Sequence, residues 1–256
     1  MIGCVAKIWL LGYHLEKNKR IGQMISFKHR HFQKEIILLV TRQYVAYSLS
    51  YRNIEEMMLE RGIHVDHSTI NRWVIYYAPL LEEEFRNNYK RTLGNSWRMD
   101  ETYLKIKGMW YYLYRAVDKA GDTIDFMLSK KRDEAAAKAF FIKAIKSSGL
   151  PENVTIDKSG ANYAGLTTIN LEFIIFYLLG FRLMQIVIRQ IKYLNNIIEQ
   201  DHRAIKRVTK QMMGFKAFHS AEATLAGIEL HHMLKKGQHK NADSQTIFQQ
   251  FYTLAA

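Results

Sequence analysis

The sequence predicts an α/β protein in which a small all-α unit precedes a domain built on a mixed sheet. Apolar residues recur at helical spacing from His31 to Tyr47 and again in two further segments before Pro79. After Trp97 the pattern changes to short β-branched and aromatic runs bounded by turn residues, then a helix and another short strand. The change of periodicity near residue 97 predicts a domain boundary there.

Composition limits the functions that this chain can have. Its 256 residues can bury a sizeable core, and its net charge of +13 is typical of proteins that bind nucleic acid or an anionic membrane surface. The apolar run Phe173–Phe181 is too short to span a membrane, so we expect it in the core and assign the charge to nucleic acid. The alternative is a basic protein without a polyanionic partner. A single cysteine, Cys4, excludes an intramolecular disulfide and a cysteine-based zinc site, which suits a cytoplasmic protein.

Three helices are expected over residues 31–79. Ser50 and Asp66 are suited to cap the second and third helices, and Gly62 would end the second. Short helices with a glycine-containing turn before the last are typical of a helix-turn-helix unit, whose third helix reads DNA. The side chains expected to meet bases and phosphates are His67, Ser68, Thr69, Asn71 and Arg72. The alternative is a helical bundle with a polar solvent face.

The second domain is expected to begin with three strands and a helix. The expected strands are Trp97–Ile106, Trp110–Val117 and Thr123–Ser129. Asp133 would cap a helix running to Lys146, and a short buried strand, 154–156, would follow it. Helix and strand are expected over 160–193, and two more helices over 195–212 and 217–235.

Two carboxylates of this domain are candidate metal ligands. Asp100 lies inside the first strand and shares its face with Leu104 and Ile106, because side chains alternate along a strand. An ionised carboxylate beside apolar neighbours is costly unless a cation or hydrogen bonds compensate it. Asp157 follows the strand 154–156, and functional residues collect at strand ends. If the two strands are parallel, the carboxylates converge and repel unless a divalent cation bridges them.

Glu199 is the third candidate, in the first turns of the helix expected from residue 195. Lys206 lies seven residues later on the same side, where it could bind a phosphate beside the site, and Arg207 follows it. The alternative is an exposed ion pair between Glu199 and Arg203, worth only about 0.2–0.5 kcal/mol. Other acidic residues compete for the same role: Glu101, Asp118, Asp125 and Asp201. A turn or surface position is expected for Asp118 and Asp125.

Three carboxylates suggest oxygen-only coordination of two Mg²⁺ or Mn²⁺ ions, which disfavours zinc. Two such ions roughly 3.5–4 Å apart can clamp an in-line phosphoryl displacement. One ion would activate water or a 3′-hydroxyl, and the other would stabilise the leaving 3′ oxygen. We therefore expect Asp100, Asp157 and Glu199 to be both catalytic residues and metal ligands.

Several ordered stretches resemble the DDE transposases of bacterial insertion sequences, most closely the group called family six. They are Asp66–Val74, Met99–Tyr103, Leu113–Asp118, Asp157-Lys158, Asn195–His202, Lys206-Arg207, Gly214–Lys216 and Gly227–Glu229. The resemblance implies an integrase-like core with a ribonuclease H-like fold, in which Asp100, Asp157 and Glu199 form the metal-binding triad. Lys206 matches the basic residue on the family's glutamate helix. It also implies a bacterial, nucleoid-associated enzyme that binds terminal inverted repeats as a homodimer or larger assembly.

Enzymes of that family cleave DNA at the element's ends and join the freed 3′ ends to target DNA. This chain departs from their pattern between Asp157 and Glu199, where it is longer and the apolar stretch 166–191 matches poorly. A catalytically inactive copy that acts only as a DNA-binding protein or regulator is therefore the alternative. The expected organisation is an extension (1–30), a helix-turn-helix domain (31–79), a linker (80–96), the catalytic domain (97–237) and a C-terminal tail (238–256).

Overall fold

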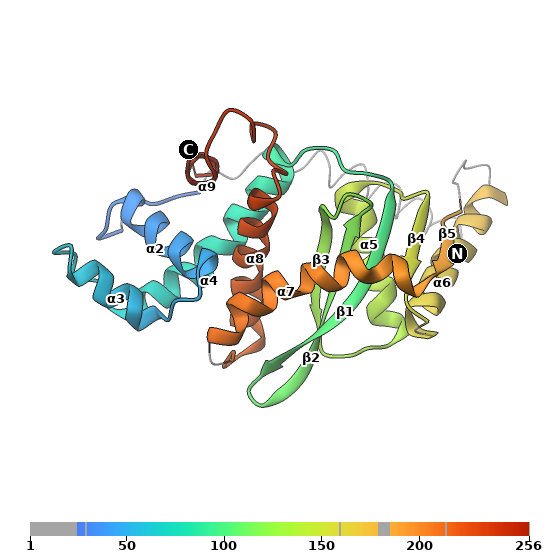
Figure 1. Ribbon diagram of the computed structural model, residues 1–256, viewed down its shortest axis with the longest axis horizontal. Helices are drawn as coiled ribbons and strands as arrows, with labels where there is room; N and C mark the ends of the chain where they lie inside the picture. The colour runs from blue at the N-terminus through green and yellow to red at the C-terminus, as the bar shows by residue number, and fades with distance from the viewer. Residues whose placement is uncertain (1–24, 29, 159, 179–184, 213, 256) are drawn as a thin grey trace. The chain divides into compact units, whose positions relative to one another are not determined.

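The computed structural model (Figure 1) describes residues 25–28, 30–158, 160–178, 185–212 and 214–255. Most of the expected N-terminal extension, 1–30, lies outside these ranges. The chain forms two compact units. Within the described residues, a sheet unit comprises 92–102 and 112–199, and a helical unit comprises 25–91, 103–111 and 200–255.

Five strands form one mixed sheet. They are β1 (Ser96–Ile106), β2 (Met109–Asp118), β3 (Thr123–Ser129), β4 (Asn153–Ile156) and β5 (Val187–Gln190). Their order in the sheet is β3-β2-β1-β4-β5, with β2 and β3 antiparallel and β4 parallel to both β1 and β5. The three expected N-terminal strands thus form within one residue of their expected bounds, because their turns carry strong local signals. At the turn between β1 and β2, Lys107 and Gly108 both adopt positive φ.

Helices α5 (Glu134–Ser148) and α6 (Gly160–Leu178) cover the sheet with apolar side chains. The Asp133 side chain caps α5 by accepting a hydrogen bond from the Ala136 amide, as the sequence predicts. The core of the unit is built mainly from Trp97, Met99, Tyr114, Phe140, Phe141, Val154, Ile156, Leu166 and Phe173. This mixed sheet flanked by helices confirms the α/β fold class that the sequence predicts.

The apolar run 173–181 enters the core only at its start. Phe173 is 2% exposed, whereas Leu178 at the end of α6 is 77% exposed, and residues 179–181 lie outside the described part of the chain. The expectation that the run lies in the core is therefore wrong for most of its described residues, since Ile174, Ile175 and Tyr177 are exposed as well. Of the described helices, none is long and apolar enough to cross a bilayer.

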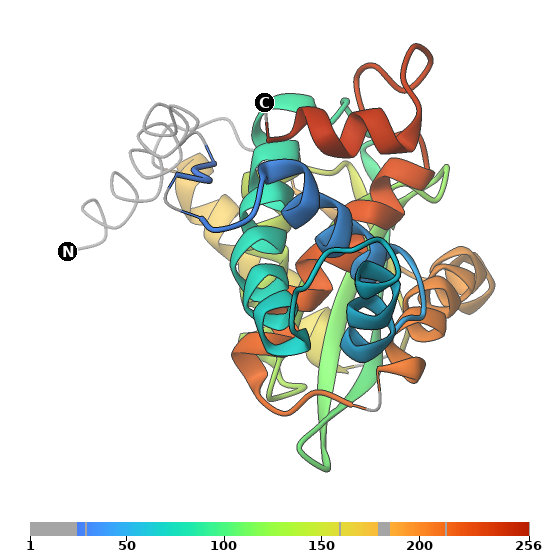
Figure 2. The same cartoon turned by 90° about the vertical axis from the view of Figure 1, so that its left-hand side faces the viewer.

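The helical unit begins with α2 (Lys34–Ala46), α3 (Tyr51–Leu59) and α4 (His67–Glu84), which Figure 2 turns toward the viewer in blue to teal. The side chains of Ser50 and Asp66 cap α3 and α4 as expected, and Gly62 has a φ of +70° after α3. Pro79 does not mark the end of α4, which continues to Glu84 and into a π-helical turn, η1 (Phe85–Tyr89).

A long C-terminal helix, α8 (Phe218–Lys235), packs against both α2 and α4. The three helices approach closely because α8 carries Gly227: a Cβ built there would lie 2.6 Å from Val45 Cγ1 and 2.9 Å from Ala78 Cβ. The segment expected as a C-terminal tail contains another helix, α9 (Ile247–Thr253), with Phe251 buried.

Two elements lie between β5 and α8 in the chain. A 3-10 turn, η2 (Lys192–Asn195), leads into α7 (Asn196–Gln211). Helix α7 begins in the sheet unit and continues into the helical unit, since the division between the units falls after Glu199.

Candidate active site

The pairing of β1 with β4 brings the first two candidate carboxylates together. The two strands are parallel, with Trp97 opposite Val154 and Arg98 opposite Thr155. Two residues further on, the same register carries Asp100 opposite Asp157, where β4 has just ended. Carboxylate oxygens of Asp100, Glu101 and Asp157 all lie within 4.8 Å of one another. Because β1 and β4 are parallel, the carboxylates of Asp100 and Asp157 converge, as the sequence predicts for parallel strands.

Glu101 joins this cluster from the buried side of β1. Only 8% of the residue is exposed, and its Oε2 atom has no hydrogen-bond partner among the described residues. Burial raises the pKa of the Glu101 carboxyl, and the Arg132 guanidinium and the Asn162 amide oppose that shift. The alternation of β1 offers a signal for this burial, since it places Glu101 on one face with Trp97 and Met99.

The guanidinium of Arg132 contacts two of the three carboxylates, those of Glu101 and Asp157. The Nε atom of Arg132 donates to Glu101 Oε1 at 3.2 Å, and its Nη2 atom donates to Asp157 Oδ2 at 3.5 Å. The side-chain amide of Asn162, near the start of α6, donates to Asp157 Oδ1 at 3.4 Å. Arg132 carries no sequence signal for this position, because it lies in a basic run, 130–132, that is typical of a solvated turn.

Glu199 does not belong to this cluster in the part of the chain that the structure describes. It is exposed in the first turn of α7. The start of that helix is nevertheless tied to β1, because the buried Asn195 donates through Nδ2 to the carbonyl of Met99 at 3.4 Å. Met99 directly precedes Asp100, so the helix that carries Glu199 begins beside the strand that carries the first ligand.

The other competing carboxylates have structural partners. Asp118 accepts hydrogen bonds from the backbone amides of Gly94, Ala120 and Asp122 in and beside its turn. Asp125 is fully buried on β3, where Lys143 Nζ lies 3.0 Å from its carboxylate. These contacts confirm a turn position for Asp118, whereas a surface position for Asp125 is wrong.

Asp201 also has a structural role, inside the helical unit. Its Oδ1 atom lies 2.6 Å from His232 Nε2 and 2.7 Å from Lys236 Nζ, both at the end of α8 or just after it. The pair of contacts fastens α7 to α8 two residues after Glu199. Asp201 therefore anchors a helix and is not free to bind a metal.

The residues expected to read DNA occupy the first turns of α4. Asp66 accepts bonds from the Ser68 amide and from the hydroxyls of Ser68 and Thr69, which lower the pKa of Asp66 to about 2. Arg72 donates to the Thr69 hydroxyl at 2.8 Å. Ser68 and Arg72 are exposed, while Thr69 and Asn71 are half-buried.

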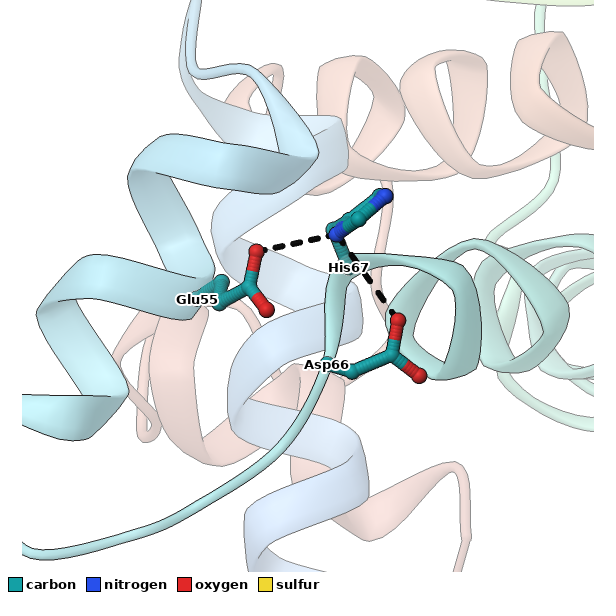
Figure 3. A group of neighbouring side chains, drawn as sticks. All are labelled: Glu55, Asp66 and His67. Atoms are coloured by element: carbon teal, nitrogen blue, oxygen red, sulfur yellow. Dashed lines mark hydrogen bonds and ion pairs between the residues drawn. The ribbon is translucent and has the colours of Figure 1, made fainter.

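His67 is held between two acidic side chains (Figure 3). Its Nδ1 atom lies 3.0 Å from Glu55 Oε2 on α3 and 3.7 Å from Asp66 Oδ1. The contact with Glu55 links α3 to the N-terminal end of α4. The remaining expected contacts, Lys206 and Arg207, are both exposed on α7, and the Arg207 carbonyl accepts from the Ser48 hydroxyl.

The cluster at β1 and β4 has the chemistry of a hard divalent cation site. All three of its donors are carboxylates, which suit Mg²⁺ or Mn²⁺ better than zinc. The buried Glu101 Oε2 atom, without a partner among the described residues, is an acceptor that a nearby cation would satisfy. The residues present therefore fit the metal that the sequence predicts.

Solved structures provide distant likenesses to the fold. The HTLV-2 integrase catalytic core domain in complex with magnesium is 21% identical, with a TM-score of 0.35 over 47% of this chain and 72% of that one. The catalytic core domain of BIV integrase is 16% identical, with a TM-score of 0.39 over 54% of this chain and 84% of that one.

Sequence relatives are much closer. The family described as the DDE domain matches residues 94–238, more than half of the chain. The transposase for insertion sequence-like element IS431mec of Staphylococcus aureus strain Mu50 is 40% identical over 226 residues, which are 88% of this chain and 94% of that protein. The transposase for insertion sequence element IS257 in transposon Tn4003 of Staphylococcus aureus matches to the same extent. The chain therefore belongs to the DDE transposases of bacterial insertion sequences.

Proposed function

We propose that this transposase binds the terminal inverted repeats of its insertion sequence, cleaves DNA at the element's ends and joins the freed 3′-hydroxyls to target DNA. The observation that carries the proposal is the convergence of Asp100 and Asp157 on adjacent parallel strands. Two carboxylates placed side by side repel each other, and they are useful together when they share a divalent cation. An inactive copy that only binds DNA would not require this arrangement.

Asp100 and Asp157 are the proposed metal ligands contributed by the sheet, and Glu199 is the proposed third ligand. Two Mg²⁺ or Mn²⁺ ions, when bound, supply Lewis acidity to the scissile phosphodiester and activate the attacking hydroxyl. Support for this role is the hydrogen bond to Met99 of β1 from Asn195, which directly precedes α7 in the chain. Lys206 follows two helical turns later and would bind a DNA phosphate near the site.

The DNA-reading role is proposed for α4, the third helix of the expected helix-turn-helix unit. Exposed or half-buried polar side chains in its first turns supply donors and acceptors for bases and phosphates, and they are His67, Ser68, Thr69, Asn71 and Arg72. Transposition requires two element ends to be held together, so we propose a homodimer or larger assembly on DNA. The net charge of +13 favours such an assembly with the nucleoid in the bacterial cytoplasm.

Cleavage of labelled DNA carrying the element's ends tests the catalytic proposal. The wild type with Mg²⁺ or Mn²⁺ is expected to nick the ends, while Asp157→Asn and Glu199→Gln reduce nicking by at least about 100-fold, since each removes a metal ligand. Glu222→Gln, which changes an exposed carboxylate on α8, is the matched control and should nick normally. If the wild type binds the ends but never nicks them, this copy is an inactive DNA-binding protein.

Binding to the same ends tests the proposed role of α4. Arg72→Ala is expected to weaken binding to the inverted repeat by about 1–3 kcal/mol if the arginine contacts a base. Arg52→Ala, which removes an exposed arginine from α3, is the control and should weaken binding less. Equal losses in the two variants, on both the inverted repeat and unrelated DNA, would contradict base reading by α4.

A further inference from the structure

We propose that Arg132 is a positioning residue of the active site, a built-in cation that competes with the catalytic metal for Asp157 and remains anchored by Glu101. The proposal rests on the metal site proposed above and assigns a role to two residues outside the expected triad. Arg132 lies between β3 and α5, one residue before the Asp133 that caps α5.

The two contacts of Arg132 are unequal. Its contact with Glu101 is the shorter, at 3.2 Å, and the Glu101 side chain is only 2% exposed. Its contact with Asp157 is longer, at 3.5 Å, and the Asp157 side chain is 36% exposed. Charge-assisted hydrogen bonds strengthen as they shorten and as water is excluded. The Glu101 contact is therefore the anchor, and the Asp157 contact is the one that can exchange.

A buried carboxylate also requires its cation more than an exposed one does. Little water can replace the guanidinium at the buried Glu101 carboxylate, so Glu101 loses more than Asp157 does when Arg132 leaves. Asp157 remains hydrated in part and can give up the guanidinium at smaller cost. We therefore assign Glu101 as the anchor of Arg132 and not as a metal ligand. Its carboxylate oxygens do lie close to those of Asp100 and Asp157.

Competition follows from the geometry at Asp157. The guanidinium donates to Oδ2 and the Asn162 amide donates to Oδ1, so both carboxylate oxygens already accept hydrogen bonds. A divalent cation binds such oxygens at about 2.0–2.6 Å and repels a guanidinium that shares them. Metal binding at Asp157 therefore displaces the Nη2 contact, and the released end of Arg132 remains held over the site by its Nε atom.

The test is calorimetric titration of the full-length protein with Mn²⁺ in the absence of DNA. Arg132→Gln is expected to bind Mn²⁺ about tenfold more tightly than the wild type, because no cation has to leave Asp157. Lys131→Gln, which removes the same charge from the adjacent residue of the same loop, is the matched control and should change the affinity less than twofold. Equal or weaker Mn²⁺ binding by Arg132→Gln would overturn the proposal.

Two further variants keep the outcome interpretable. Arg132→Lys retains the charge, but a single shorter ammonium group cannot reach both carboxylates, so its Mn²⁺ affinity should also rise. If circular dichroism shows that Arg132→Gln does not fold, Arg132→Lys is the deciding variant. An Mn²⁺ affinity of Arg132→Lys equal to that of the wild type would contradict competition between Arg132 and the metal. Asp157→Asn should abolish Mn²⁺ binding. If the wild type and Asp157→Asn bind Mn²⁺ equally, the metal site itself is misassigned, and that failure is distinguishable from failure of the Arg132 proposal.

Discussion

Mild acid is expected to destabilise the helical unit through a single buried histidine on α8. His231 is 3% exposed, and neither ring nitrogen has a hydrogen-bond partner among the described residues. Burial lowers the pKa of His231 to about 3, and the positive charges of Lys235, Arg42 and His232 act in the same direction. The folded protein therefore keeps the imidazole neutral at pH values where the unfolded chain protonates it.

The sign and size of the effect follow from linkage. A histidine whose folded pKa is depressed contributes its full stability above the unfolded pKa of about 6.5, and the contribution falls as pH decreases toward the folded pKa. Between pH 7.5 and pH 5 the loss is on the order of 2 kcal/mol, since about one and a half pH units separate pH 5 from the unfolded value. Below pH 3 the loss stops growing.

Denaturant unfolding of the wild type and of His231→Leu, monitored by circular dichroism from pH 5 to pH 7.5, measures this term. The variant cannot bind the proton, so the stability difference between the two proteins should change by about 2 kcal/mol over the range. His219→Leu, which replaces an exposed histidine at the other end of α8, should leave the pH dependence unchanged. Parallel stability curves for the wild type and His231→Leu would refute the reasoning.

Two other changes test the packing of α8. Gly227→Ala should destabilise the protein by about 1–3 kcal/mol, because its Cβ would overlap Val45, whereas Gly160→Ala, whose Cβ meets no described atom within 4 Å, should be nearly neutral in thermal unfolding. Asp201→Asn should lower stability by about 1.5–3 kcal/mol by weakening its contact with Lys236, and should also slow DNA nicking, since α7 carries the proposed ligand Glu199. Loss of stability without any loss of nicking would separate the anchor from the site.

Local chemistry made much of the fold predictable. Ser50, Asp66 and Asp133 cap their helices as expected, because a side-chain oxygen before an amphipathic segment can satisfy free amides at the helix start. The β1–β2 turn was predictable for a related reason, since Lys107-Gly108 interrupts two strand-forming runs. Such signals act within a few residues and do not depend on the remainder of the chain.

Contacts between segments that are far apart in the sequence were harder to predict. Asp100 and Asp157 converge as expected, because parallel pairing follows from a helical crossover. Arg132 and Glu101 were not recognised as a pair, since their side chains meet only after β1 and the end of β3 are placed in one sheet. Periodicity also could not show that Leu178, at the end of α6, would be exposed. Glu199 as the third ligand remains a prediction, because it is not part of the described carboxylate cluster.

The packing of α8 has a consequence for how this protein is made. Helices α2 and α4 bury Val45 and Ala78 against Gly227, which the ribosome adds well over a hundred residues after them. Until that residue emerges, the first helices of a nascent chain have only part of their core. A message that is cut short upstream of α8 should therefore produce no folded fragment of the proposed DNA-reading helices.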